Sequence, residues 1–120
     1  MKLQIKRIYE APSPEDGKRI FVDRLWARGL TKDKAQLDEW EKELAPSTEL
    51  RKWYGHDPEK FEEFGKRYRA ELDANQDAAT FAEKIAEYDG TVTLLYGAKN
   101  GETSNAAVVK EWLEDKISKG

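Results

Sequence analysis

The sequence contains no cysteine, and it has a single histidine, His56. The absence of cysteine excludes a disulfide framework, a thiolate nucleophile and a cysteine-ligated metal site. One histidine also excludes a metal site built from several histidines of the same chain. No apolar run is long enough to cross a bilayer, and the N-terminal residues lack the apolar core of a secretion signal. We therefore expect a cytoplasmic protein, and we assign no metal ligands.

Charge and aromatic content narrow the class of protein further. Of the 120 residues, 38% are apolar and 38% are charged, while four Trp, five Tyr and four Phe supply large side chains for a core. This length and composition predict one folded domain, residues 1–120. The net charge of −3 gives no overall attraction to nucleic acid or to anionic membranes, so neither is an expected partner.

Short apolar runs alternate with amphipathic patterns along the chain. Runs typical of strands occur at residues 3–9, 19–23 and 91–96. Helical spacing or helix-start signals occur near residues 31–34, 49–54, 58–73, 78–86 and 104–117. Strands separated by helices predict an α/β fold, with a small parallel or mixed sheet of about four strands flanked by helices in Rossmann-like layers.

One segment, residues 37–44, fits two kinds of element. Leu37, Trp40 and Leu44 lie on one face of a helix. Trp40 and Leu44 also share one face of a strand, although Lys42 between them interrupts the apolar pattern. The residues alone favour the helix over the strand.

The run at residues 19–23 is the one around which we organise the functional prediction, because charged residues follow its apolar part. Ligands of open α/β sheets bind beyond the carboxyl ends of strands, which is where Asp23, Arg24 and Arg28 are expected. Arginine offers a planar fork that matches phosphate or carboxylate, and Asp23 would orient an arginine or act as acid or base. The alternative is a structural ion pair between Asp23 and an arginine.

Other candidate residues come from segments farther along the chain. Ser47 opens a predicted helix whose free N–H groups suit an anion, with Arg51 one turn later, although ordinary capping explains Ser47 equally well. His56 is a candidate general base, because histidine is the side chain suited to proton transfer near neutral pH, but it sits in a loop where surface histidines are common. Tyr96 ends the last predicted strand and Lys99 lies in the loop after it. Tyr96 would donate a hydrogen bond to a ligand and Lys99 would neutralise its charge; the alternative is that they are a rim aromatic and a solvated lysine. No glycine-rich phosphate loop, nucleophile elbow or metal-ligand spacing is present, and the sequence leaves any cofactor unknown.

Several blocks of the sequence resemble the YeaO-like proteins, which are grouped under domain of unknown function 488. The blocks cover nearly the whole chain and lie at residues 22–30, 37–40, 44–53, 55–58, 64–68 and 92–99. The resemblance implies a small α/β domain, and it shifts residues 40–44 toward a strand. It implies no established activity.

The chain departs from the family pattern at two places. Ala27 stands where the family usually has proline, which loosens the loop before Arg28. Many relatives carry histidines in the stretch that matches residues 103–107, where only Asn105 of this chain fits the pattern. Any role of those histidines as a base or as metal ligands does not transfer to this chain, and Asn105 joins the candidate ligand-binding residues.

Two hypotheses follow from these patterns. In the first, the protein binds or acts on an anionic, phosphate-bearing small molecule at the strand-end rim, with Asp23, Tyr96 and His56 as candidate catalytic residues. Candidate ligand-binding residues are Arg24, Arg28, Ser47, Arg51, Lys99 and Asn105. In the alternative, the chain is a non-enzymatic module that binds a protein partner or forms a homodimer.

Overall fold

The computed structural model describes residues 1–119 and shows four strands in a single sheet. All neighbouring strands are parallel, and their order across the sheet is β1-β4-β2-β3. The strands are β1 (Lys2–Arg7), β2 (Lys18–Phe21), β3 (Glu39–Trp40) and β4 (Thr91–Tyr96). With helices between the strands, this architecture confirms the predicted α/β fold.

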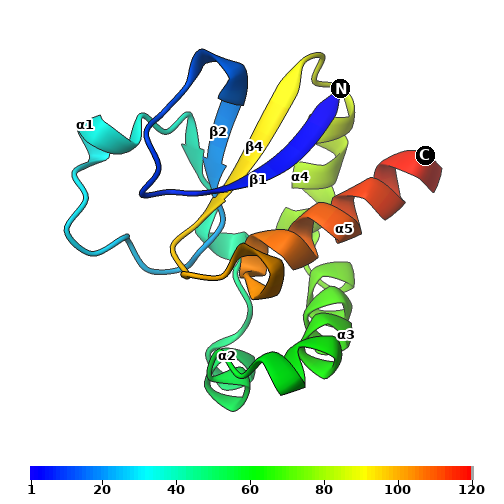
Figure 1. Cartoon of the computed structure of the whole chain (residues 1–120). Coiled ribbons are helices and arrows are strands. Elements are labelled where there is room, and N and C mark those ends of the chain that lie inside the picture. The colour runs from blue at the N-terminus through cyan, green and yellow to red at the C-terminus, as the bar shows by residue number, and fades with distance from the viewer. Residues whose placement is uncertain (120) are drawn as a thin grey trace.

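Helices cover the two faces of the sheet unequally. The α-helices are α1 (Lys32–Ala35), α2 (Thr48–Tyr54), α3 (Phe61–Asp73), α4 (Gln76–Ala86) and α5 (Asn105–Lys119). Figure 1 shows α3, α4 and α5 on one side of the sheet, while α1 and the long loops around it lie on the other. Within residues 1–119, no helix has the length and apolarity needed to cross a membrane.

The core divides into two apolar clusters, one on each face of the sheet. Successive side chains of a strand point to opposite faces, so Ile20 of β2 packs with the helices while Phe21 packs beneath the α1 segment. In β4, Leu94 and Leu95 divide in the same way, and both are completely buried. Burial on both faces explains why β4 reads as a continuous apolar run.

Residues 37–44 contain a short strand and a 3₁₀ turn where the residue pattern favours an α-helix. β3 (Glu39–Trp40) pairs with β2, and a 3₁₀ turn (Lys42–Leu44) follows it. The backbone N–H of Asp38 donates to the carbonyl of Arg19 at 2.9 Å, and that of Glu41 donates to Phe21 at 2.8 Å. These bonds to a neighbouring strand outweigh a helical pattern of only two turns. The helix preference was therefore wrong. The strand that the family resemblance implies for residues 40–44 is correct at Trp40 but not at residues 42–44, which form the 3₁₀ turn.

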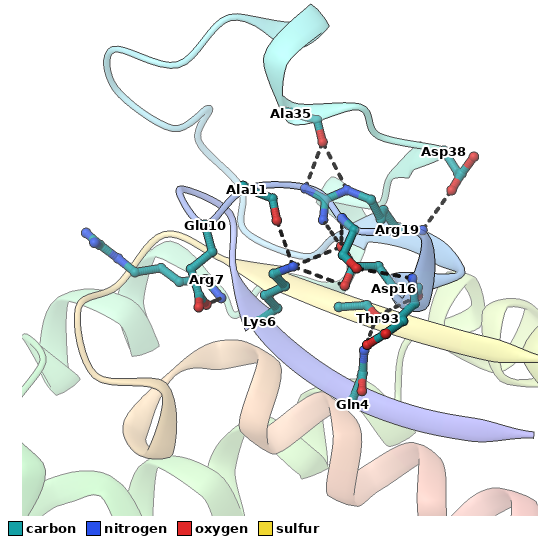
Figure 2. Close-up of polar contacts among 12 residues, drawn as sticks. Gln4, Lys6, Arg7, Glu10, Ala11, Asp16, Arg19, Ala35, Asp38 and Thr93 are labelled. Atoms are coloured by element: carbon teal, nitrogen blue, oxygen red, sulfur yellow. Dashed lines mark hydrogen bonds and ion pairs between the residues drawn. The ribbon is translucent and has the colours of Figure 1, made fainter.

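A buried polar network lies on the face of the sheet that α1 covers. Figure 2 shows the Asp16 carboxylate between two cations: Oδ2 lies 2.6 Å from Arg19 Nη1 and 3.1 Å from Lys6 Nζ. Arg19 also donates from Nε and Nη2 to the Ala35 carbonyl at 3.0 and 2.8 Å, which ties α1 to β2. Asp16 and Arg19 are only 3% and 4% exposed, so this network belongs to the interior of the fold.

Candidate functional site

A cavity of about 270 Å³ opens at the carboxyl ends of β2 and β4. Its walls come from the loop after β2, from α2 and the turn that follows it, from α3, and from the segment that joins β4 to α5. The charged and polar side chains in its lining include Asp23, Arg24, Arg51, His56 and Asn105. The cavity thus lies where ligands bind in parallel α/β sheets.

The parallel pairing of β2 with β4 brings Asp23 into this cavity. Phe21 lies beside Leu95, so the chain two residues farther along places Asp23 beside Gly97. The Gly97 N–H donates to Asp23 Oδ2 at 2.8 Å, and Asn105 Nδ2 at the start of α5 donates to Oδ1 at 3.1 Å. Three segments that are distant in sequence therefore meet at one carboxylate.

The electrostatic surroundings of Asp23 disfavour its charged form. Burial raises the pKa of this carboxyl above its ordinary value, and the bonds from Gly97 and Asn105 and the nearby charge of His56 offset only part of that effect. No lysine or arginine in the described part of the chain forms an ion pair with Asp23. The carboxylate is held by neutral donors alone.

Arg24 and Arg51 bring positive charge to the same cavity. Arg24 follows Asp23 directly, and Arg51 lies in the middle of α2. Both side chains are exposed, and neither forms an ion pair with a carboxylate of residues 1–119. Their guanidinium forks are therefore not committed to holding the fold together.

The turn after α2 presents His56 in an unusual backbone conformation. Gly55 and His56 have φ values of 53° and 58°, in the left-handed region that a residue with a Cβ rarely adopts. Tyr54, the residue before this turn, holds it in place, because its ring stacks on Phe64 with centroids 4.0 Å apart and its hydroxyl donates to the Thr103 carbonyl at 2.9 Å. The end of α2 is thus attached both to α3 and to the segment that precedes α5.

Four sequence-predicted site residues lie outside the lining of this cavity: Arg28, Ser47, Tyr96 and Lys99. Arg28 and Lys99 are exposed in loops. The Tyr96 side chain is only 8% exposed and packs into the core, where a Cβ on Gly101 would overlap its phenol oxygen.

The hydrogen-bond donors of Ser47 are already used by a carboxylate of the protein itself, that of Glu71. The Ser47 N–H and hydroxyl donate to Glu71 Oε1 and Oε2 at 2.8 and 2.6 Å, while Ser47 Oγ accepts from the Leu50 N–H at 3.1 Å. The helix start that suits an anion therefore already holds the side chain of Glu71 from α3. This contact leaves the cations of the cavity, and not Ser47, as the groups open to an external anion.

Sequence reasoning missed the residues that shape the cavity. Gly97 could have been found, because it follows β4 directly and so faces Asp23 across a parallel pair. Tyr54, Phe64 and Thr103 gave no signal beyond that of ordinary core or loop residues. Among residues 1–119, no group of three or more His, Asp or Glu side chains is placed to hold a metal ion.

Comparison with known proteins gives family relationships. A family model described as "Inactive DUF488-N3 subclade" matches residues 2–120. The uncharacterized protein YeaO of Escherichia coli is 42% identical over 113 residues, which span 94% of this chain and 97% of that protein. The uncharacterized proteins Mb3100c of Mycobacterium bovis and Rv3073c of Mycobacterium tuberculosis are each 40% identical over 114 residues, or 93% of either chain. No solved structure matches. These matches confirm the resemblance to YeaO-like proteins.

Proposed function

This chain belongs to the DUF488-N3i family, and on that premise we propose that it binds an anionic, phosphate-bearing small molecule in the strand-end cavity without converting it. The observation that carries the proposal is the pair of arginines, Arg24 and Arg51. They come from separate segments, line one cavity, and have no carboxylate partner among the described residues. Two free guanidinium forks at the mouth of a cavity suit a phosphate group.

The size and chemistry of the cavity support binding of a small molecule. A volume of about 270 Å³ is slightly below the range of roughly 300–1,000 Å³ that is usual for ligand pockets. Apolar surface from Leu25, Pro46, Tyr54 and Phe64 adjoins the charged groups, so a short organic portion can be covered while the anion meets the arginines. A compact phosphorylated metabolite fits these limits better than a polymer.

Three observations favour binding over turnover. The matching family is described as inactive. The phenol of Tyr96, one of the candidate proton-transfer groups, packs in the core outside the cavity lining. The histidines that many relatives carry near Asn105 are absent from residues 103–107 of this chain. Asp23 and His56 then act as polar groups of the binding surface.

The alternative, a protein-interaction or homodimerisation module, has less support. The large apolar side chains that are exposed in residues 1–119 are Met1, Tyr9 and Leu25, and they come from separate segments. Leu25 also lines the cavity, which gives it a place in ligand binding.

A thermal-shift screen of phosphorylated metabolites and nucleotides tests the proposal, because a ligand that binds only the folded protein raises its melting temperature. We expect Arg24→Met and Arg51→Met each to weaken a hit by about 1.5–3 kcal/mol, since each removes a charge-assisted contact with the phosphate. Arg28→Met is the matched control, because Arg28 is equally exposed but lies outside the cavity lining. Equal weakening by Arg28→Met, or undiminished binding in both cavity variants, would contradict the proposal.

A further inference from the structure

The strand-end cavity contains a carboxylate, that of Asp23, which forms no ion pair with a lysine, arginine or histidine of residues 1–119. Asp23 is half-buried and lines the cavity, and its two bonds come from a backbone N–H and a side-chain amide, both neutral. Carboxylates withdrawn from water are ordinarily paired with a cation, because desolvation otherwise disfavours the ionised form. The raised pKa of the Asp23 carboxyl is consistent with this missing partner.

We propose that the bound ligand itself supplies this partner, as a protonated nitrogen group that pairs with the Asp23 carboxylate while its phosphate meets Arg24 and Arg51. The inference rests on the proposed function, because both charges belong to one small molecule in one cavity. The ligand class is thus a zwitterion: an ammonium or amidinium group separated from a phosphate by a few bonds.

The hydrogen-bond capacity of Asp23 leaves room for such a group. Each carboxylate oxygen accepts about two hydrogen bonds. Gly97 N–H and Asn105 Nδ2 use one position on each oxygen, at 2.8 and 3.1 Å, so each oxygen keeps a second position. The two bonds also fix the orientation of the carboxylate before the ligand arrives, which reduces the entropy that binding costs.

The cations already present at the cavity do not fill this role. Arg24 and Arg51 are exposed and form no ion pair with Asp23 in the part of the chain that the structure describes. His56 is near enough to lower the pKa of Asp23, but it makes no hydrogen bond with the carboxylate. The cavity therefore has a positive part at the arginines and a negative part at Asp23, and it suits a ligand that carries a phosphate for the first and a protonated nitrogen for the second.

Two probes of equal size separate the phosphate contribution from the nitrogen contribution. Propyl phosphate and O-phosphoethanolamine have the same number of non-hydrogen atoms, and a methyl group in the first replaces the ammonium of the second. Chemical-shift titration of the ¹⁵N-labelled full chain measures both affinities, including weak ones. We expect O-phosphoethanolamine to bind about tenfold to a hundredfold tighter, which is the usual effect of a charge-assisted hydrogen bond.

Variants of the chain then assign the difference to Asp23. Asp23→Asn should bring the two affinities to within about twofold, because it removes the charge and keeps the shape of the side chain. Asp33→Asn is the matched control: Asp33 is an exposed carboxyl of α1 outside the cavity lining, and its loss should leave the preference unchanged.

The outcomes distinguish this inference from the proposed function. Equal affinity of the unaltered protein for both probes would overturn the nitrogen-group inference and leave phosphate binding in place. A preference that persists in Asp23→Asn would overturn the assignment to Asp23. Absence of binding by both probes at millimolar concentrations would overturn the proposed function and this inference with it. Because the probe comparison uses the unaltered chain, the test holds even if Asp23→Asn folds poorly.

Discussion

Asp16 precedes β2 in the chain and Asp23 follows it, and the two carboxylates differ in whether cations contact them. Asp16 is 3% exposed and contacts Lys6 and Arg19. Burial alone would raise the pKa of the Asp16 carboxyl, but hydrogen bonds from the Ser13 N–H, Lys6 and Arg19 outweigh burial, and the pKa lies below its ordinary value of 3.8. Asp23 receives only neutral donors, and burial keeps its pKa above the same ordinary value.

The difference separates a charge that the fold uses from a charge that it leaves available. The cations around Asp16 are part of the chain, and through the Ala35 carbonyl Arg19 also holds α1 against the sheet. Around Asp23, the hydrogen bonds from Gly97 and Asn105 orient the carboxylate, and no cation of residues 1–119 forms an ion pair with it. A carboxylate of the first kind is expected to matter for stability, and one of the second kind for binding.

Removing a cation from the Asp16 network should have the largest effect. Arg19→Met leaves the buried Asp16 carboxylate with Lys6 as its remaining cation and breaks the two bonds to the Ala35 carbonyl. We expect a loss of about 3–5 kcal/mol in the free energy of unfolding, because removing one partner of a buried ion pair is strongly destabilising. Urea unfolding at neutral pH measures this loss.

Lys18→Met is a suitable control for Arg19→Met, because Lys18 is the preceding residue of β2 and pairs with Glu39 outside the Asp16 network. We expect a loss of about 1 kcal/mol or less from this partly exposed pair. Similar losses in the two variants would contradict the special role assigned to Arg19.

The sequence predicts the elements that local contacts determine and misses those that depend on contacts between distant segments. The strand at residues 91–96 was predicted with the bounds that the structure has, and the helix predicted at residues 58–73 ends at Asp73 as predicted, because local spacing encodes both; its first turn, Pro58–Lys60, is a separate 3₁₀ helix. The strand β3 depends on pairing with β2, which no pattern within residues 37–44 reveals. Its two residues are too few to show an alternating pattern.

The site was predictable in part, for a similar reason. The charged residues after the apolar run 19–23, together with the rule for parallel sheets, predict that Asp23 and Arg24 lie at a strand end, and both line the cavity there. The contact between Ser47 and Glu71 joins residues 24 positions apart, on α2 and α3, and nothing in the sequence marks Glu71 as the partner. The Asp16 network was missed because a Pro-rich loop normally predicts exposed charges.

Lowering the pH should change the contributions of the two aspartates to folding stability in opposite directions. The lowered pKa of Asp16 means that its contribution to stability is present above pH 3.8 and is lost as the pH falls through that lowered pKa. The raised pKa of Asp23 means that ionising it costs stability as the pH rises from 3.8 through the raised pKa, and this cost is complete above it. Urea unfolding of Asp16→Asn and Asp23→Asn beside the parent, between about pH 3 and 7, measures both slopes.

We expect Asp16→Asn to be most destabilising at neutral pH and progressively less so in acid. Asp23→Asn should behave in the reverse way, so that its free energy of unfolding improves relative to the parent as the pH rises. The two differences from the parent should therefore change with pH in opposite directions. Parallel slopes in the two variants would show that the two carboxylates do not differ in the way described.

The smallest effect on stability is expected from Arg24, although Arg24 lies next to Asp23. Arg24 is exposed and forms no ion pair within residues 1–119, and methionine retains much of its aliphatic stem. Arg24→Met should therefore change the free energy of unfolding by no more than about 0.5 kcal/mol, as an exposed substitution away from structural contacts does. Urea unfolding beside Arg28→Met measures it. A loss approaching that of Arg19→Met would mean that Asp23 relies on Arg24 in the folded protein, and the contrast between the two aspartates would then fail. An unchanged stability, joined to weaker binding of a phosphate-bearing ligand, would assign the charge of Arg24 to the ligand and not to the fold.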